Sequence, residues 1–119
     1  MHLNQVDAYF SGHDHTMEHL SQNYLNSTVE YIVSGASNFV DDSTPNMNTV
    51  PKNSLKFTWK TGEIQNLTCK NCSGAFVYVT TTKEKMSFKY LNTKGEDIYS
   101  NLTIYSKNSG SYKNSLSNL

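Results

Sequence analysis

The sequence has few of the residues that would give it a large core, a strong charge or a disulfide framework. Only 36% of its 119 residues are hydrophobic, it contains two cysteines and two prolines, and ten basic residues balance ten acidic ones. The low apolar content fits one small domain with a thin core. A neutral chain has no electrostatic footprint for nucleic acid or an anionic membrane. No apolar run is long enough to span a bilayer, and residues 1–5 lack the basic and apolar regions of a signal peptide.

The two cysteines, Cys69 and Cys72, form a single C-x-x-C pair. Without a second such pair or paired histidines nearby, this spacing does not predict a zinc site. A redox role is disfavoured because no β-α-β pattern accompanies the pair. Two interpretations stay open: a short local disulfide in an oxidising compartment, or two free thiols.

Asparagine is abundant, and four triplets match the acceptor pattern for N-glycosylation, beginning at Asn26, Asn66, Asn71 and Asn101. A chain rich in Asn, Ser and Thr produces such triplets by chance. Together the four modestly favour a secretory or lysosomal lumen.

The hydrophobic pattern predicts a chain built mostly from strands. Expected strands are residues 6–10, 29–33, 55–59, 74–80, 86–91 and 98–104. The last three follow one another through turns and form an antiparallel meander with one solvated face.

Polar and small residues fill the connections. Residues 16–22 are ambiguous, and residues 41–53, with both prolines, form a loop. The small residues 34–38 allow a close approach of backbone or ligand, with a plain turn slightly favoured. The composition of residues 106–119 predicts a polar, disordered tail.

The strongest functional pattern is Gly12-His13-Asp14-His15, which follows the first expected strand. On extended backbone, residues i and i+2 point the same way, so His13 and His15 would converge while Asp14 faces away. Two imidazoles suit a transition metal, but a catalytic site normally takes three protein ligands. The pattern predicts part of a metal site. His19 lacks an HExxH context and is interpreted as a lone surface histidine.

Residues 6–15, VDAYFSGHDH, resemble the last metal-binding motif of the purple acid phosphatases, closest to the small tartrate-resistant type. Residues 29–39, VEYIVSGASNF, resemble the strand and small-residue turn that follow in that family. Val50-Pro51 and the segments 55–57, 74–79 and 86–90 then occur in the family's order, so that the resemblance covers residues 3–104. GHxH alone is shared by the wider metallophosphoesterases, whereas this succession of segments is much more specific.

The resemblance implies the α/β class. Residues 1–105 would form the C-terminal portion of a four-layer α/β/β/α metallophosphoesterase sandwich, itself mostly antiparallel β. It also implies a secreted or lysosomal acid phosphatase that hydrolyses phosphomonoesters with Fe(III) and a divalent metal, Zn, Fe or Mn. By match, His13 would ligate the divalent metal and His15 the ferric ion. Asp14 would orient the loop or a histidine.

The family's earlier ligand motifs, of the D-x-H, GDxxY and GNH types, are absent from these residues. The chain is therefore expected to correspond to the C-terminal third of such an enzyme and to need the missing N-terminal part of the same domain. No catalytic residue is assigned within the chain itself. The alternative is a truncated, inactive β-rich fragment or binding module.

Overall fold

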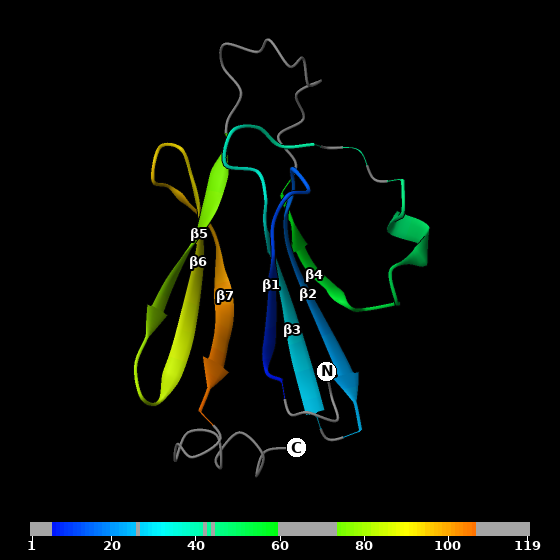
Figure 1. Cartoon of the computed structure of the whole chain (residues 1–119), viewed down its shortest axis with the longest axis vertical. Coiled ribbons are helices and arrows are strands. Elements are labelled where there is room, and N and C mark those ends of the chain that lie inside the picture. Colours follow the sequence, from blue (N-terminus) through cyan, green and yellow to red (C-terminus); the bar gives the residue numbers. More distant parts are fainter. Residues whose placement is uncertain (1–5, 26, 42, 44, 60–73, 107–119) are drawn as a thin grey trace.

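The computed structural model describes residues 6–25, 27–41, 43, 45–59 and 74–106, and these form two β-sheets (Figure 1). Several predicted features lie outside the described residues: the cysteine pair Cys69 and Cys72, the acceptor asparagines Asn26, Asn66 and Asn71, and the tail from residue 107. The predicted domain and tail boundary, residues 1–105 and 106–119, stays a prediction.

The first sheet contains the segment that leads into the GHDH motif. Its strands are β1 (Ala8–Ser11), β2 (Met17–Tyr24), β3 (Ser27–Ser34) and β4 (Leu55–Thr58). Their order is β1-β3-β2-β4, with β1 parallel to β3 and the other neighbours antiparallel. The alternation of β2 explains its placement, because Met17 and His19 are buried while Glu18 and Leu20 are partly exposed.

The second sheet is the predicted meander. Its strands are β5 (Ala75–Thr81), β6 (Lys85–Asn92) and β7 (Asp97–Tyr105). Both neighbouring pairs are antiparallel, and the prediction for this region is confirmed. Gly95 supplies the positive φ of 78° in the turn before β7.

The two sheets pack face to face, and the core lies between them (Figure 1). The buried cluster takes side chains from both sheets and from the segment after β3: Met17, Ile32, Ala36, Val40, Ala75, Phe88, Tyr90 and Leu102. Phe57, Tyr90 and Tyr99 add an aromatic group, with the Phe57 and Tyr99 rings stacked at 4.5 Å. The Tyr90 hydroxyl crosses to the other sheet and donates to the Glu18 carbonyl at 2.9 Å.

The expectation of a mostly antiparallel β chain is confirmed, with β1 and β3 as the parallel exception. Of the ambiguous residues 16–22, all but Thr16 fall in strand β2, and the predicted loop over 41–53 contains a short 3₁₀ helix, η2 (Met47–Thr49). The described residues thus supply two sheet layers and almost no helix, so the four-layer sandwich stays a prediction. No helix in the described part of the chain is long and apolar enough to cross a membrane.

Candidate functional site

The GHDH motif forms a bent loop between β1 and β2. The sequence predicted an extended backbone here. Instead, residues 13–15 bend, and His13 has a left-handed φ of 75°. The bend arises where the chain leaves a parallel strand and must return as the antiparallel neighbour of β3. The predicted extended backbone is therefore wrong, and the i, i+2 spacing does not by itself bring His13 and His15 together.

His15 is the most constrained side chain of the loop. Its ring stacks on Phe39 with 3.9 Å between centroids and 27° between planes, and its carbonyl accepts a hydrogen bond from the Asp41 N–H. The side chain is half-buried. Its Nδ1 atom is fully buried and has no hydrogen-bond partner among the described residues. An unpaired buried nitrogen costs about 1–3 kcal/mol, so this atom suits a ligand that would satisfy it.

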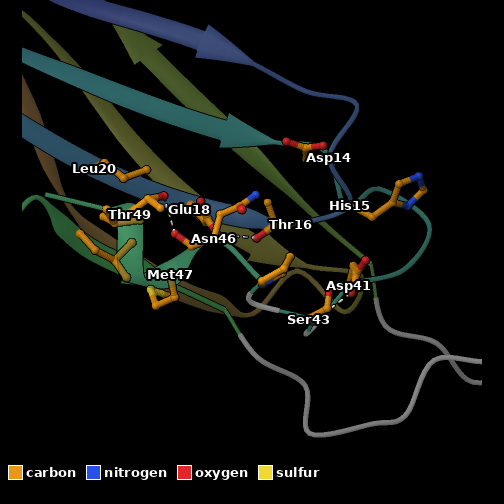
Figure 2. A pocket seen from close by; sticks show the side chains of 13 residues that line it. Asp14, His15, Thr16, Glu18, Leu20, Asp41, Ser43, Asn46, Met47 and Thr49 are labelled. Carbon is orange, nitrogen blue, oxygen red and sulfur yellow. Dashed lines mark hydrogen bonds between the residues drawn. The ribbon is translucent and has the colours of Figure 1, made fainter.

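His13 and Asp14 are exposed. The Asp14 carbonyl accepts from the Thr16 N–H at 2.7 Å, which tightens the loop. Figure 2 shows the side chains of Asp14 and His15 leaving the loop in different directions. The orienting role predicted for Asp14 stays a prediction.

A cavity of ≈ 360 Å³ lies beside His15, between strands β2 and β4 and the segment that carries η2 (Figure 2). Leu20, Met47 and Leu55 are among its apolar lining residues, and the acidic residues Asp14, Glu18 and Asp41 also line it. Its lining residues in the described part of the chain include no lysine. Such a cavity repels a phosphate anion unless cations neutralise the carboxylates.

Asp41 lies at the loop-facing end of this cavity. Hydrogen bonds from Ser43 hold the pKa of the Asp41 carboxyl below its ordinary value, and one of them is the Ser43 N–H donating at 2.8 Å. The carboxylate is therefore in its charged form at neutral pH. It adds negative charge beside His15, whose role as a metal ligand stays a prediction.

Within the described residues, no group of three or more His, Cys, Asp or Glu side chains could hold a metal ion. The residues present fit a metal in part: an imidazole with an unpaired buried nitrogen and an exposed imidazole two residues away. Any further ligands would have to come from residues that the structure does not describe or from another part of a larger protein.

The interpretation of His19 as a surface histidine is wrong. It is 5% exposed, its Nε2 lies 2.8 Å from a Glu30 carboxylate oxygen, and its Nδ1 lies 2.8 Å from the Tyr99 hydroxyl. The alternation of β2 could have revealed this, because His19 shares the inward face of Met17.

Among the predicted glycosylation sites, Asn101 is in the described part and is exposed on β7.

A scan against family models found no match. Individual proteins do match: the chain is 32% identical over 94 residues to a protein of Oryctolagus cuniculus, covering 79% of this chain and 26% of that protein. A Sus scrofa protein is 30% identical over 95 residues, covering 80% of this chain and 25% of the relative. A Rattus norvegicus protein is 33% identical over 94 residues, covering 79% of this chain and 25% of that protein.

The class that these relatives define is acid phosphatase. All three are tartrate-resistant acid phosphatase type 5, and this chain is similar to that enzyme in particular. The resemblance stated from the GHDH motif and the segments after it is confirmed as a partial match to the C-terminal part. The chain spans about a quarter of the length of these curated relatives over the matched residues.

Proposed function

We propose that this chain is the C-terminal part of a metal-dependent acid phosphatase that hydrolyses phosphomonoesters. The observation that carries the proposal is the similarity to tartrate-resistant acid phosphatase type 5 over four-fifths of the chain. The loop around His15 supports it independently, because a half-buried imidazole with an unpaired nitrogen is a suitable metal ligand.

In the complete enzyme, His13 would ligate a divalent metal, Zn, Fe or Mn, and His15 would ligate Fe(III). When bound, a metal pair of this kind polarises phosphate oxygens and lowers the pKa of a coordinated water. The chain's own contribution is to hold the two imidazoles. Phe39 limits the rotation of the His15 ring, and the Asp41 N–H fixes the backbone at the same residue.

The charge of the cavity beside His15 is consistent with this assignment. Asp14, Glu18 and Asp41 line it, so a phosphomonoester dianion would bind nearby only with cations to offset them. Cations held at His13 and His15 would supply that positive charge. The remaining ligands would come from the N-terminal part of the same four-layer α/β/β/α domain, packed beside the two sheets described above.

The enzyme is proposed to be secreted or lysosomal. Asn101 supports this location modestly, because it heads an Asn-Leu-Thr triplet and is exposed on β7. The other predicted acceptors and the Cys69–Cys72 pair belong to the same proposal, since a local disulfide persists in an oxidising compartment.

A chimera tests the proposal. Residues 3–104 replace the matching C-terminal part of the Oryctolagus cuniculus enzyme, and bound iron and hydrolysis of an aryl phosphate are measured. We expect iron binding and turnover, with turnover falling to background in His13→Ala and His15→Ala versions. The matched control is His19→Gln, at a histidine that serves the core, and it should retain metal in whatever fraction of the protein folds.

Two results would count against the proposal. One is a folded chimera that binds no iron, and the other is turnover that survives the loss of both loop histidines. Either would favour the alternative, an inactive β-rich fragment or binding module.

A further inference from the structure

Three segments far apart in the sequence meet at the end of the sandwich that carries the GHDH loop. Residues 34–41 run between the loop and the start of β5. The Gly35 N–H donates to the Thr16 carbonyl at 3.1 Å on one side, and the Ala75 N–H donates to the Ala36 carbonyl at 2.8 Å on the other. The loop is thus attached to the second sheet through residues 35 and 36.

Gly35 allows this attachment by leaving space for the loop. A Cβ at residue 35 would lie 1.7 Å from the Asp14 carbonyl oxygen and 2.7 Å from the Asp14 carbonyl carbon. Both are backbone atoms, so no side-chain rotation relieves the clash. The φ of Gly35 is not the reason, because Gly95 is the glycine with a positive φ among the described residues.

Gly74, just before β5, likewise leaves space for a neighbouring backbone, that of residues 36 and 37. A Cβ there would lie 2.2 Å from the Ser37 carbonyl oxygen and 2.9 Å from the Ala36 carbonyl oxygen. The glycines therefore let backbone stack on backbone, from the GHDH loop through residues 35–37 to β5. The close approach that small residues 34–38 permit is an approach of main chain to main chain.

Phe39 is placed against His15 by the same segment. Ala36 and Val40 on either side of it are 0% and 2% exposed and belong to the core. Their burial fixes the backbone that carries Phe39, whose ring stacks on His15 at 3.9 Å. The next N–H, that of Asp41, donates to the His15 carbonyl.

The glycine of the GHDH motif itself is under less constraint. A Cβ at Gly12 would meet the Ser34 carbonyl oxygen at 3.4 Å, an ordinary contact distance. Gly12 therefore provides a matched control for Gly35: it is the same residue type, in the loop that Gly35 contacts.

We propose that Gly35 and Phe39 are positioning residues for His15. Gly35 sets the distance between the loop backbone and residues 34–41, and Phe39 sets the plane of the imidazole. The inference rests on the proposed function only where it takes His15 to be a metal ligand. Neither residue needs to touch metal or substrate.

The test uses the full chain with its histidine rings labelled for NMR, free of metal, followed by titration with Zn²⁺ as the probe. We expect Gly35→Ala and Phe39→Ala to remove the ring-current shift of the His15 protons and to weaken Zn²⁺ binding by about 10–100-fold, as loss of a ligand's supporting contacts typically does. Gly12→Ala should keep both properties close to those of the original chain. Phe39→Trp should restore them, because an indole also offers a face for stacking.

Unchanged His15 shifts in Phe39→Ala would overturn the inference, as would equal effects of Gly12→Ala and Gly35→Ala. If Gly35→Ala fails to fold, the Phe39→Ala and Phe39→Trp pair still decides, since the half-buried Phe39 side chain is less needed for folding. A chain whose His15 shifts depend on Phe39 but which binds no Zn²⁺ supports the positioning role, and the metal assignment is then decided by iron binding in the chimera described above. The failure of the inference is thus distinguishable from the failure of the proposed function.

Discussion

His15 and His19 are four residues apart in the sequence and have opposite surroundings. His19 lies between the sheets with both ring nitrogens at 2.8 Å from partners, Tyr99 and Glu30. His15 lies in a loop with one ring nitrogen buried and unpaired among the described residues. A histidine with both nitrogens satisfied stabilises the fold, whereas one held in place with a free nitrogen remains available to a ligand.

The region around His19 is also chemically adaptable. With neutral His19, Nε2–H can donate to Glu30 while the Tyr99 hydroxyl donates to Nδ1. With protonated His19, both nitrogens donate and the Tyr99 hydroxyl accepts. The network therefore keeps its hydrogen bonds in either state. Among the described residues, the His15 ring has no comparable set of hydrogen-bond partners.

The largest expected difference between the two regions is in stability. His19→Ala should lower the free energy of unfolding by about 3 kcal/mol, because it leaves Glu30 and Tyr99 without their shared partner. His15→Ala should change it by less than about 1 kcal/mol, since the lost stacking on Phe39 is offset by removal of an unpaired buried nitrogen. Urea unfolding of the full chain, followed by Trp59 fluorescence, measures both.

His19→Gln serves as a milder control, because an amide can replace part of the hydrogen bonding and should recover some of the loss. If His15→Ala proved as destabilising as His19→Ala, the GHDH loop would be part of the stabilising core and the contrast between the regions would be lost.

The second difference concerns alkaline pH. Burial raises the pKa of Tyr90 far above its ordinary value of 10.0, with Tyr99 and then Glu18 adding to the shift. Burial likewise raises the pKa of Tyr99. A raised folded-state pKa means that full stability is present below pH 10.0 and is lost as the pH rises beyond it, because the unfolded chain ionises first.

Tyr90→Phe should cost about 1 kcal/mol at neutral pH, because the hydrogen bond to the Glu18 carbonyl is lost. It should also make the alkaline decline shallower than in the original chain. Unfolding midpoints measured from pH 8 to 11.5 test both points. Tyr78→Phe, at a residue 54% exposed on β5, should leave the midpoint and its pH dependence nearly unchanged. An identical alkaline slope in Tyr90→Phe and Tyr78→Phe would show that Tyr90 is not the group responsible.

Part of the fold was predictable from the sequence, and part of it was not. Period-2 alternation and turn residues located the meander β5–β7 and strand β3, because those signals are local. The parallel pairing of β1 with β3 and the order of the first sheet depend on contacts across the chain, which local signals do not report.

The candidate site was also predictable only in part. The motif identified His13 and His15 as residue types suited to metal. The bend at His13 and the stacking of Phe39 on His15 depend on how residues 34–41 pack, and motif spacing contains no such information. The burial of His19 was not predicted, because residues 16–22 were ambiguous from the sequence and the inward face of β2 is defined only by the structure.

The smallest expected effect is at the edge of the loop region. Ser43 holds the pKa of the Asp41 carboxyl below its ordinary value of 3.8, so the stability that this group contributes is present above pH 3.8 and is lost as the pH falls through the folded-state value. Asp41→Asn retains an acceptor for the Ser43 N–H but has no charge to titrate, so its urea midpoint should fall slightly less than that of the original chain between pH 6 and pH 3. Asp97→Asn, at an exposed carboxylate at the start of β7, is the comparison variant. Because Asp41 is exposed, its effect should be far smaller than that of the buried His19. An Asp41 effect as large as the His19 effect would mean that the segment beside the GHDH loop stabilises the fold as strongly as the contacts between the sheets.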